Sequence, residues 1–114
     1  MTDCLFCRIA RGEIPAQKVA ENDHALAFRD ITPQAPTHVL VIPKTHVADS
    51  AAQLGASQAA MLGAIFELAA QVARAEKLDQ GWRLVTNVGA QAGQSVPHLH
   101  FHLLGGRSMQ WPPG

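Results

Sequence analysis

The sequence predicts an α+β domain: an antiparallel sheet of about five strands, one long helix that covers one face of the sheet, and one short helix. The predicted order of helix, three strands, helix and two strands is typical of this class. The strand segments are short and bounded by turn residues, whereas residues 57–76 place apolar side chains at helical spacing. With 114 residues, the chain is expected to form a single domain over residues 1–114.

A short helix is predicted over residues 4–10, where Leu5, Phe6 and Ile9 are spaced for one helical face. Gly12 suits the C-cap of this helix. The turn pair Asn22-Asp23 then separates residues 19–21 from residues 25–28. This first quarter of the chain therefore predicts a helix followed by a pair of strands.

Three further strands are predicted, over residues 38–42, over residues 82–87 and within residues 95–104. Two prolines make residues 31–37 a stiff loop before the first of these strands, and Pro43 ends it. Residues 89–93 form the loop between the last two strands.

The main helix is predicted from Ser57 to about Glu76. A short helical turn precedes it, because Ser50 and Gln53 have the spacing of a capping box, and Gly55 ends that turn. The apolar stripe of the main helix consists of Met61, Leu62, Ile65, Leu68, Ala69 and Val72. Such a stripe indicates a helix that packs on the core of the domain.

Three histidines recur at every second residue within Ser95–Leu104. On a strand, His98, His100 and His102 would point to one side. Leu99, Phe101 and Leu103 would then point into the core on the other side, and Pro97 suits the first position of the strand. Such a row of imidazoles has three explanations: a solvated polar face, a set of metal ligands, or a nucleophile with supporting groups.

This stretch resembles the histidine triad family, whose motif is His-x-His-x-His followed by apolar residues. Residues 28–38, 41–44 and 105–114 are similar to the Hint branch of that family, so the resemblance extends from about residue 4 to the C-terminus. It implies the histidine triad fold and a homodimer whose two sheets join into one of ten strands. It also implies that the tail, residues 105–114, reaches toward the partner subunit.

The resemblance also implies a set of catalytic residues. His100 would attack phosphorus, oriented by the backbone carbonyl of Gly93, and His102 would contact the phosphate. Ser95 matches the position that hydrogen-bonds the leaving group. His38 is the fourth histidine, behind the triad, and His98 is the first histidine of the motif. Because His102 is present where some branches carry Gln, hydrolysis is favoured over nucleotidyl transfer.

A nucleotide site follows from the same resemblance. Asp30 would accept hydrogen bonds from both ribose hydroxyls, although it could simply cap its loop. Asn87 would donate to the phosphate together with Gln94 and Ser95, although Asn87 could equally be a turn former before Gly89. The apolar walls around a purine would be Phe6, Ile14, Phe28 and Ile31. Trp111 would reach the partner's site, unless it is an ordinary exposed terminal residue.

Cys4-x-x-Cys7 has the spacing of a pair of metal ligands. Together with His46 and His98 it would complete a tetrahedral zinc site, as in several bacterial members of the family. With all four positions filled, the zinc would be structural, and catalysis would need no metal. The alternative is a pair of half-buried thiols on one helical face.

The resemblance implies a hydrolase that cleaves the P–N bond of purine nucleoside 5′-phosphoramidates, or acts on aminoacyl-adenylate-like compounds, through a nucleotidyl-histidine intermediate. The alternatives are a dinucleoside polyphosphate hydrolase, a nucleotide-binding regulatory or interaction module, and a zinc hydrolase with His98, His100 and His102 as ligands. The formal net charge is zero, without a basic stripe, so a nucleic-acid partner is not expected. We expect a cytoplasmic protein without membrane contact, because the two closely spaced cysteines suggest a reducing compartment.

Overall fold

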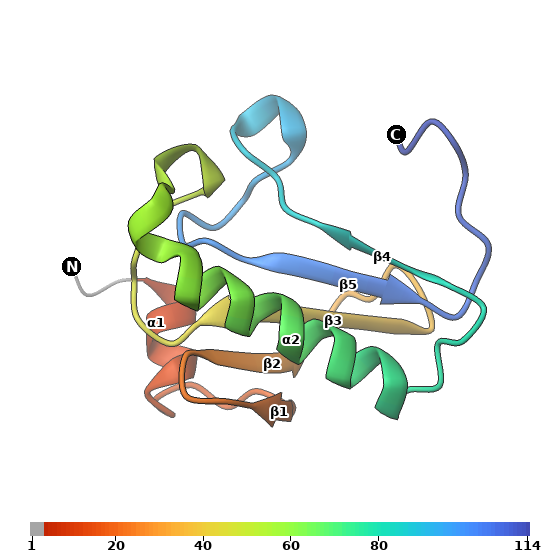
Figure 1. The fold of residues 1–114 in the computed structure, drawn as a ribbon, viewed down its shortest axis with the longest axis horizontal. Helices are drawn as coiled ribbons and strands as arrows, with labels where there is room; N and C mark the ends of the chain where they lie inside the picture. Colours follow the sequence, from red (N-terminus) through yellow and green to blue (C-terminus); the bar gives the residue numbers. More distant parts are fainter. Residues whose placement is uncertain (1–3) are drawn as a thin grey trace.

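A computed structural model describes residues 4–114, which form a two-layer arrangement of sheet and helix (Figure 1). Five antiparallel strands lie in the order β1-β2-β3-β5-β4. The elements are α1 (Leu5–Ala10), β1 (Lys18–Glu21), β2 (Ala25–Arg29), β3 (Thr37–Pro43), α2 (Ala59–Ala75), β4 (Trp82–Val85) and β5 (Phe101–Gly105), with 3-10 turns η1 (Ala51–Gln53), η2 (Ala56–Gln58) and η3 (Ala90–Ala92). The predicted fold class is confirmed, and the ten-stranded dimer stays a prediction.

The long helix α2 crosses one face of the sheet and buries the main core (Figure 1). Its side chains Ile65, Leu68 and Ala69 are completely buried there. From the sheet they meet Ala25, Ala27, Val39, Val41, Leu99, Phe101 and Leu103. Residues 56–75 have the length and the mean hydropathy, 1.2, of a membrane-crossing helix. Their contacts with the sheet are instead those of a core helix in a two-layer domain.

The opposite face of the sheet is covered by α1. Phe6 of α1 packs there against Leu26, Phe28, Leu40 and Ile42. All seven residues of β3 are buried, because both faces of this central strand are covered. This explains why β3 appears in the sequence as a continuous apolar run rather than an alternating pattern.

Helix α1 ends in a Schellman motif, as the position of Gly12 predicts. The N–H of Glu13 donates to the carbonyl of Arg8 over 2.8 Å, and the N–H of Gly12 donates to Ile9 over 3.0 Å. Gly12 has a φ of +77°, which favours glycine. At the other end, the Sγ atom of Cys4 accepts a hydrogen bond from the N–H of Cys7. Both ends of this six-residue helix are therefore defined.

The last two strands are shorter than predicted. β5 begins at Phe101, and residues 97–100 are irregular, because the N–H of Leu99 donates to Ala48 instead of continuing the ladder with β3. The alternation of side chains nevertheless persists, since Leu99 is buried in the α2 core. β4 ends at Val85 rather than at residue 87. The predicted alternation, which puts the histidines on the face away from the α2 core, is thus correct. His98 and His100 nevertheless precede the regular strand.

The helix starts also differ in detail from prediction. Ser50 caps η1 by accepting from the N–H of Ala52, but Gln53 accepts from Asp49 rather than from Ser50. The second bond of the predicted capping box is therefore made one residue earlier than expected, to Asp49 instead of Ser50. Before α2, the side chain of Gln58 accepts from the N–H of Gly55, so the segment after Gly55 begins as the 3-10 turn η2.

Candidate functional site

The three histidines of the motif lie at the start of β5, on the face of the sheet that α1 covers. His98 and His100 are buried and His102 is partly buried. The ring of Phe6 meets His98 and His100 edge-on, with ring centroids 5.8 and 5.0 Å apart. Phe6 also contacts Phe28, at 5.7 Å. The first turn of α1 therefore shields these imidazoles from water.

His100 is held in one tautomer by the main chain. Its Nδ1 atom lies 2.7 Å from the carbonyl oxygen of His98, which can only accept, so Nδ1 carries the hydrogen. In the neutral ring, Nε2 then bears the lone pair. The predicted role of the Gly93 carbonyl in orienting His100 is wrong, because His98 supplies the carbonyl. Gly93 instead ends η3, with a φ of +91°.

The hydrogen of His102 is fixed on Nε2, the opposite tautomer, by a chain of hydrogen bonds from the loop before β3. We call Gln34, His38 and His102 the relay. The backbone N–H of Gln34 donates to Nδ1 of His38 over 3.0 Å, so the hydrogen of His38 lies on Nε2. That Nε2–H donates to Nδ1 of His102 over 2.9 Å, which leaves the hydrogen of His102 on its own Nε2. Hence His100 presents a lone pair and His102 presents a donor.

Burial keeps these relay histidines neutral. Burial, together with the positive charges of protonated His100 and His38, lowers the pKa of His102 to about 4. Burial also lowers the pKa of His38, against the attraction of Asp30. The ligand atoms of Asp30, His38 and His102 lie within 4.8 Å of one another. Because Gln34 fixes a hydrogen on Nε2 of His38, this cluster is a hydrogen-bond relay and not a metal site.

The predicted ribose and purine residues lie at different places. Asp30 accepts from the N–H of Thr32 through Oδ1, and its Oδ2 lies 3.4 Å from Nε2 of His38. Ile14 and Phe28 share a cleft of about 280 Å³ beside the end of α1. Ile31 projects into solvent and is 99% exposed. The carboxylate of Asp30 thus already caps its loop, and its ribose contact stays a prediction.

The loop between β4 and β5 is held together by Gln94. Its side-chain Oε1 accepts from the N–H of Gly89, and its Nε2 donates to the carbonyls of Asp49 and Val96. The amide is fully used in these bonds, so it supports the loop rather than offering a free donor to phosphate. Ser95 is exposed and Asn87 is half-buried, and Ser95 lines a cavity of about 240 Å³ with Asp49 and Pro97.

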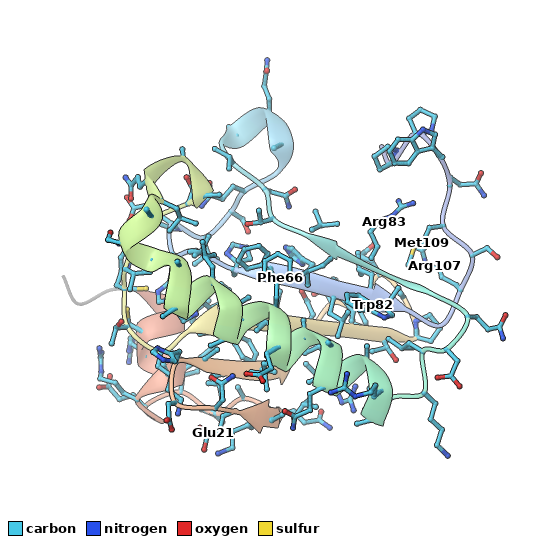
Figure 2. All side chains as sticks on the ribbon, in the orientation of Figure 1. Glu21, Phe66, Trp82, Arg83, Arg107 and Met109 are labelled. Atoms are coloured by element: carbon cyan, nitrogen blue, oxygen red, sulfur yellow. The ribbon has the colours of Figure 1, made fainter. Side chains whose placement is uncertain are left out.

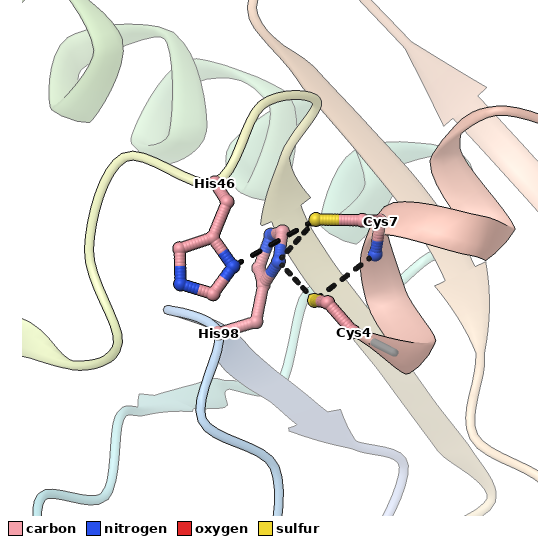
Figure 3. Close-up of side chains that lie close together, drawn as sticks. All are labelled: Cys4, Cys7, His46 and His98. Carbon is pink, nitrogen blue, oxygen red and sulfur yellow. Dashed lines mark hydrogen bonds between the residues drawn. The ribbon is translucent and has the colours of Figure 1, made fainter. Parts of the chain in front are cut away.

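Cys4, Cys7, His46 and His98 converge from α1, the loop after β3 and the segment before β5 (Figure 3). Nδ1 of His98 lies 3.0 Å from Sγ of Cys4 and 3.5 Å from Sγ of Cys7, and Nδ1 of His46 lies 3.7 Å from Cys7. For Zn–S bonds of about 2.3 Å and Zn–N bonds of about 2.0 Å, a tetrahedron separates its ligand atoms by roughly 3.3–3.8 Å. The two distances to Cys7 fall within this range, and the distance from His98 to Cys4 is about 0.3 Å shorter, so a small side-chain shift would let the four donors bind a tetrahedral zinc ion.

Each histidine of this cluster has its lone pair directed inward. Nε2–H of His98 donates to the carbonyl of Pro43 over 3.2 Å, and Nε2–H of His46 donates to Asp49 over 2.6 Å. Burial lowers the pKa of His98 to about 4, so this ring is neutral. Burial raises the pKa of the Cys4 thiol, but hydrogen bonds from Cys7 and His46 bring it below its ordinary value. Neutral imidazoles and thiolates are the forms that bind metal.

The structure does not support the three motif histidines as a common metal site. Among residues 4–114, two groups have ligand spacing, and neither contains all three. His98 faces the cysteines, His100 bonds a carbonyl through Nδ1, and His102 bonds His38. The alternative of a zinc hydrolase with these three histidines as ligands is therefore not supported.

The C-terminal tail is attached along β4. Arg83 donates to the carbonyl of Gln110 over 3.0 Å, and Arg107 donates to the carbonyl of Gln34 over 3.0 Å. Figure 2 labels Arg83 and Arg107 near the C-terminal segment. Trp111 is 82% exposed at the end of this tail. Its predicted contact with a partner subunit stays a prediction.

Sequence reasoning missed several supporting groups. Thr86 donates its hydroxyl to the carbonyl of His100 over 2.7 Å, and the carbonyl of Pro43 orients His98. Main-chain acceptors and a strand threonine carry no signal in a single sequence. The sequence did contain a signal for Asp49. It follows His46 by three residues, a spacing at which a carboxylate can orient a histidine ligand.

Comparison with known proteins places this geometry in context. Residues 11–109 match the model of the HIT domain. A 14 kDa zinc-binding protein from Brassica juncea is 49% identical over 98% of this chain and 100% of its own length. The crystal structure of a HIT family hydrolase from Legionella pneumophila has a TM-score of 0.94 and 53% identity, covering 98% of this chain and 100% of that chain. A histidine triad nucleotide-binding protein from Candida albicans has a TM-score of 0.82 and 33% identity, covering 96% and 83%.

Proposed function

Since this chain belongs to the HIT domain family, we propose that it hydrolyses purine nucleoside 5′-phosphoramidates and aminoacyl-adenylate-like compounds to nucleoside monophosphates. The observation that carries this proposal is the pair of opposite tautomers at His100 and His102. Their rings lie 5.2 Å apart, so one phosphoryl group can meet a nucleophile and a hydrogen-bond donor together. The names of the relatives from Legionella pneumophila and Candida albicans support hydrolysis and nucleotide binding.

The reaction proceeds in two displacements. Nε2 of His100 attacks phosphorus, an N–P bond forms, and the P–N bond of the substrate breaks as its electron pair leaves with the nitrogen, which takes a proton from solvent and departs as the amine. Ser95 hydrogen-bonds the departing group. Water then attacks phosphorus, a P–O bond forms, the bond to His100 breaks, and the lone pair returns to Nε2 while the proton of water passes to solvent. Dividing one displacement in this way lowers each barrier.

The surroundings of His100 favour the covalent intermediate. Phosphorylation of Nε2 makes the ring cationic, and its Nδ1–H then donates to the His98 carbonyl as a charged donor. Meanwhile Nε2–H of His102 donates to a phosphoryl oxygen as negative charge develops there. The ring of Phe6 packs edge-on against His100, and this apolar contact strengthens the hydrogen bond from Nδ1 of His100 by reducing exposure to water.

The nucleoside is proposed to lie beside this pair. Asp30 would accept hydrogen bonds from the ribose through the carboxylate oxygen that faces His38, and Phe28 and Ile14 would contact the purine. Asn87 would contact the phosphate. Support comes from the position of Phe6, which touches both His100 and Phe28 and so connects the reacting centre to the apolar wall.

A structural zinc ion is proposed at Cys4, Cys7, His46 and His98. The donor chemistry supports it, and the Brassica juncea relative is named a zinc-binding protein. Zinc there would cross-link α1 to two loops of a small domain, and its four protein ligands leave no position for substrate. The catalytic steps use the organic side chains alone.

A homodimer is proposed as the working form. β4 is an edge strand of the sheet, and both Trp82 on β4 and Phe66 on α2 are exposed, at 41% and 54%. A second copy that pairs with this edge would cover unpaired backbone groups. It would also bring the exposed Trp111 of one chain toward the other.

The test is to trap the intermediate. The protein is incubated with adenosine 5′-phosphoramidate, quenched in base and analysed by peptide mass spectrometry. AMP is expected on the peptide that contains His100, and His100→Asn should lack it. A parallel assay with a diadenosine polyphosphate should give slower turnover. A faster reaction with the dinucleotide would favour the alternative hydrolase, and the absence of AMP-modified His100 would overturn the mechanism.

A further inference from the structure

We propose that Arg107 is a positioning residue for His102, acting through Gln34 and His38. The kinetic part of this inference rests on the proposed function, whereas the structural part does not. Arg107 lies after the end of β5, at the start of the tail, and touches none of the histidines. It contacts the loop before β3 that fixes the tautomer of His38.

The peptide groups of Gln34 are held from both sides. Nε of Arg107 donates to the Gln34 carbonyl over 3.0 Å, while the Gln34 N–H donates to Nδ1 of His38 over 3.0 Å. The Gln34 side chain also donates to the carbonyl of Thr32. Residues 31–34 are exposed to solvent, so such bonds, rather than burial, hold this part of the loop.

The segment that carries Arg107 is itself fixed. Gly106 has a φ of +90°, and a Cβ atom built on it would lie 2.9 Å from Cβ of Pro36. Only glycine allows this close approach of the tail to the loop. Nη1 of Arg107 further donates to the carbonyl of Ser108 over 3.1 Å. The guanidinium is thus held toward Gln34 by the carbonyl of the neighbouring Ser108.

Loss of this contact would change which atom of His102 carries hydrogen. If the Gln34 N–H moves away, His38 can take its hydrogen on Nδ1, and its Nε2 becomes an acceptor. His102 must then donate from Nδ1, which leaves a lone pair on the Nε2 that should face phosphate. Asp30 lies 3.4 Å from Nε2 of His38 and favours the original tautomer. The effect of Arg107 is therefore partial, about the strength of one hydrogen bond.

Arg83 provides a matched control. It also holds the tail, through the carbonyl of Gln110 over 3.0 Å, and it does so from β4 without contacting Gln34. Arg83→Ala should therefore release the tail from β4 but leave the relay intact, whereas Arg107→Ala removes the hydrogen bond to Gln34 and leaves the bond between Arg83 and Gln110 in place. Arg107→Lys keeps a donor that can reach the carbonyl and should restore most of the effect.

The experiment is long-range ¹H–¹⁵N NMR of histidine-labelled protein, which reports the tautomer of each ring. Arg107→Ala is expected to shift His38 and His102 toward a mixture of tautomers, and Arg83→Ala is expected to leave them unchanged. With adenosine 5′-phosphoramidate, kcat should fall about 3- to 10-fold in Arg107→Ala, with little change in KM. Circular dichroism and thermal melting verify that each variant is folded.

Equal shifts in the Arg83 and Arg107 variants would overturn the inference, because the tail as a whole would then be responsible. Unchanged tautomers in Arg107→Ala would overturn it as well. If the wild-type protein does not hydrolyse the phosphoramidate, the proposed function fails. The NMR comparison still decides the role of Arg107 in that case.

Discussion

The Nδ1 atom of His100 lies 2.7 Å from the carbonyl oxygen of His98, so one motif histidine fixes the tautomer of the next through its main chain. The irregular backbone of residues 97–100 makes this possible, because a regular strand would direct that carbonyl toward a neighbouring strand. The late start of β5 therefore helps to orient His100, the proposed nucleophile. The same peptide segment depends on further contacts, which can be removed one at a time.

Thr86→Val should lower both stability and activity. The Thr86 hydroxyl donates to the carbonyl of the buried His100, and valine has nearly the same shape without the donor. The free energy of unfolding should fall by about 1–3 kcal/mol, since a buried carbonyl loses a partner. Urea denaturation and phosphoramidate turnover measure the two effects. Thr32→Val, at an exposed loop position, is the control and should change neither.

Asp49→Asn should weaken zinc binding by about 10- to 100-fold, because Asp49 accepts from Nε2 of His46 over 2.6 Å and sets the direction of its lone pair. It also raises the pKa of His46, so its charge makes this ring a stronger base. Competition with a zinc-binding dye measures the affinity. The control is Asp79→Asn, in the turn between α2 and β4. Equal affinities in both variants would contradict the role of Asp49.

The stability of the protein should fall in acid, in part because of His102. Burial lowers the pKa of this ring from 6.5 to about 4, so between these values the unfolded chain binds a proton that the folded chain does not. Its contribution is complete above about pH 6.5 and is lost toward pH 4, at about 1.4 kcal/mol per pH unit. In His102→Gln, the decline of the unfolding free energy between about pH 6.5 and about pH 4.5 should be shallower. The measurement is urea denaturation of the wild-type protein and of His102→Gln, both treated with a chelator. An equal decline of the unfolding free energy with pH in the two proteins would refute this assignment.

Gly106→Ala should destabilise the protein by about 1–3 kcal/mol, because it combines a positive φ with a contact to Pro36. Gly55→Ala is the matched control, since Gly55 has an extended φ of −150° and open space around its Cα atom. Thermal melts of the two variants give the comparison. An equal melting temperature for both would show that the tail-to-loop contact adapts to a methyl group.

The sequence was sufficient for the fold and less so for the site. The strands and α2 could be predicted because burial is recorded in local periodicity, and α1 because Gly12 marks its end. The start of β5 could not, since it depends on a bond between Leu99 and Ala48, which are far apart in the chain. The same limit explains the error at Gly93. A carbonyl oxygen is present in every residue, so only the three-dimensional structure identifies which one orients His100.

The metal-ligand cluster was easier to foresee than the relay. The Cys4-x-x-Cys7 spacing is visible in the chain, and the family resemblance implied His46 and His98 as the other two members of the cluster. Gln34 and Arg107 are common surface residues and gave no such indication. Gln94 gave a misleading indication, because the family resemblance implied a donor to phosphate, whereas its side chain hydrogen-bonds the loop itself.

His98 contributes to two sites through two different groups: its imidazole faces the sulfur atoms of the cysteines, and its backbone oxygen accepts a hydrogen bond from the proposed nucleophile, His100. Every amino acid has that oxygen, but few have a suitable ring. A chain that exchanged this side chain together with the two thiols would therefore lose the proposed zinc ligands and keep the carbonyl that orients residue 100. The two properties can be inherited separately, even though they meet in one histidine.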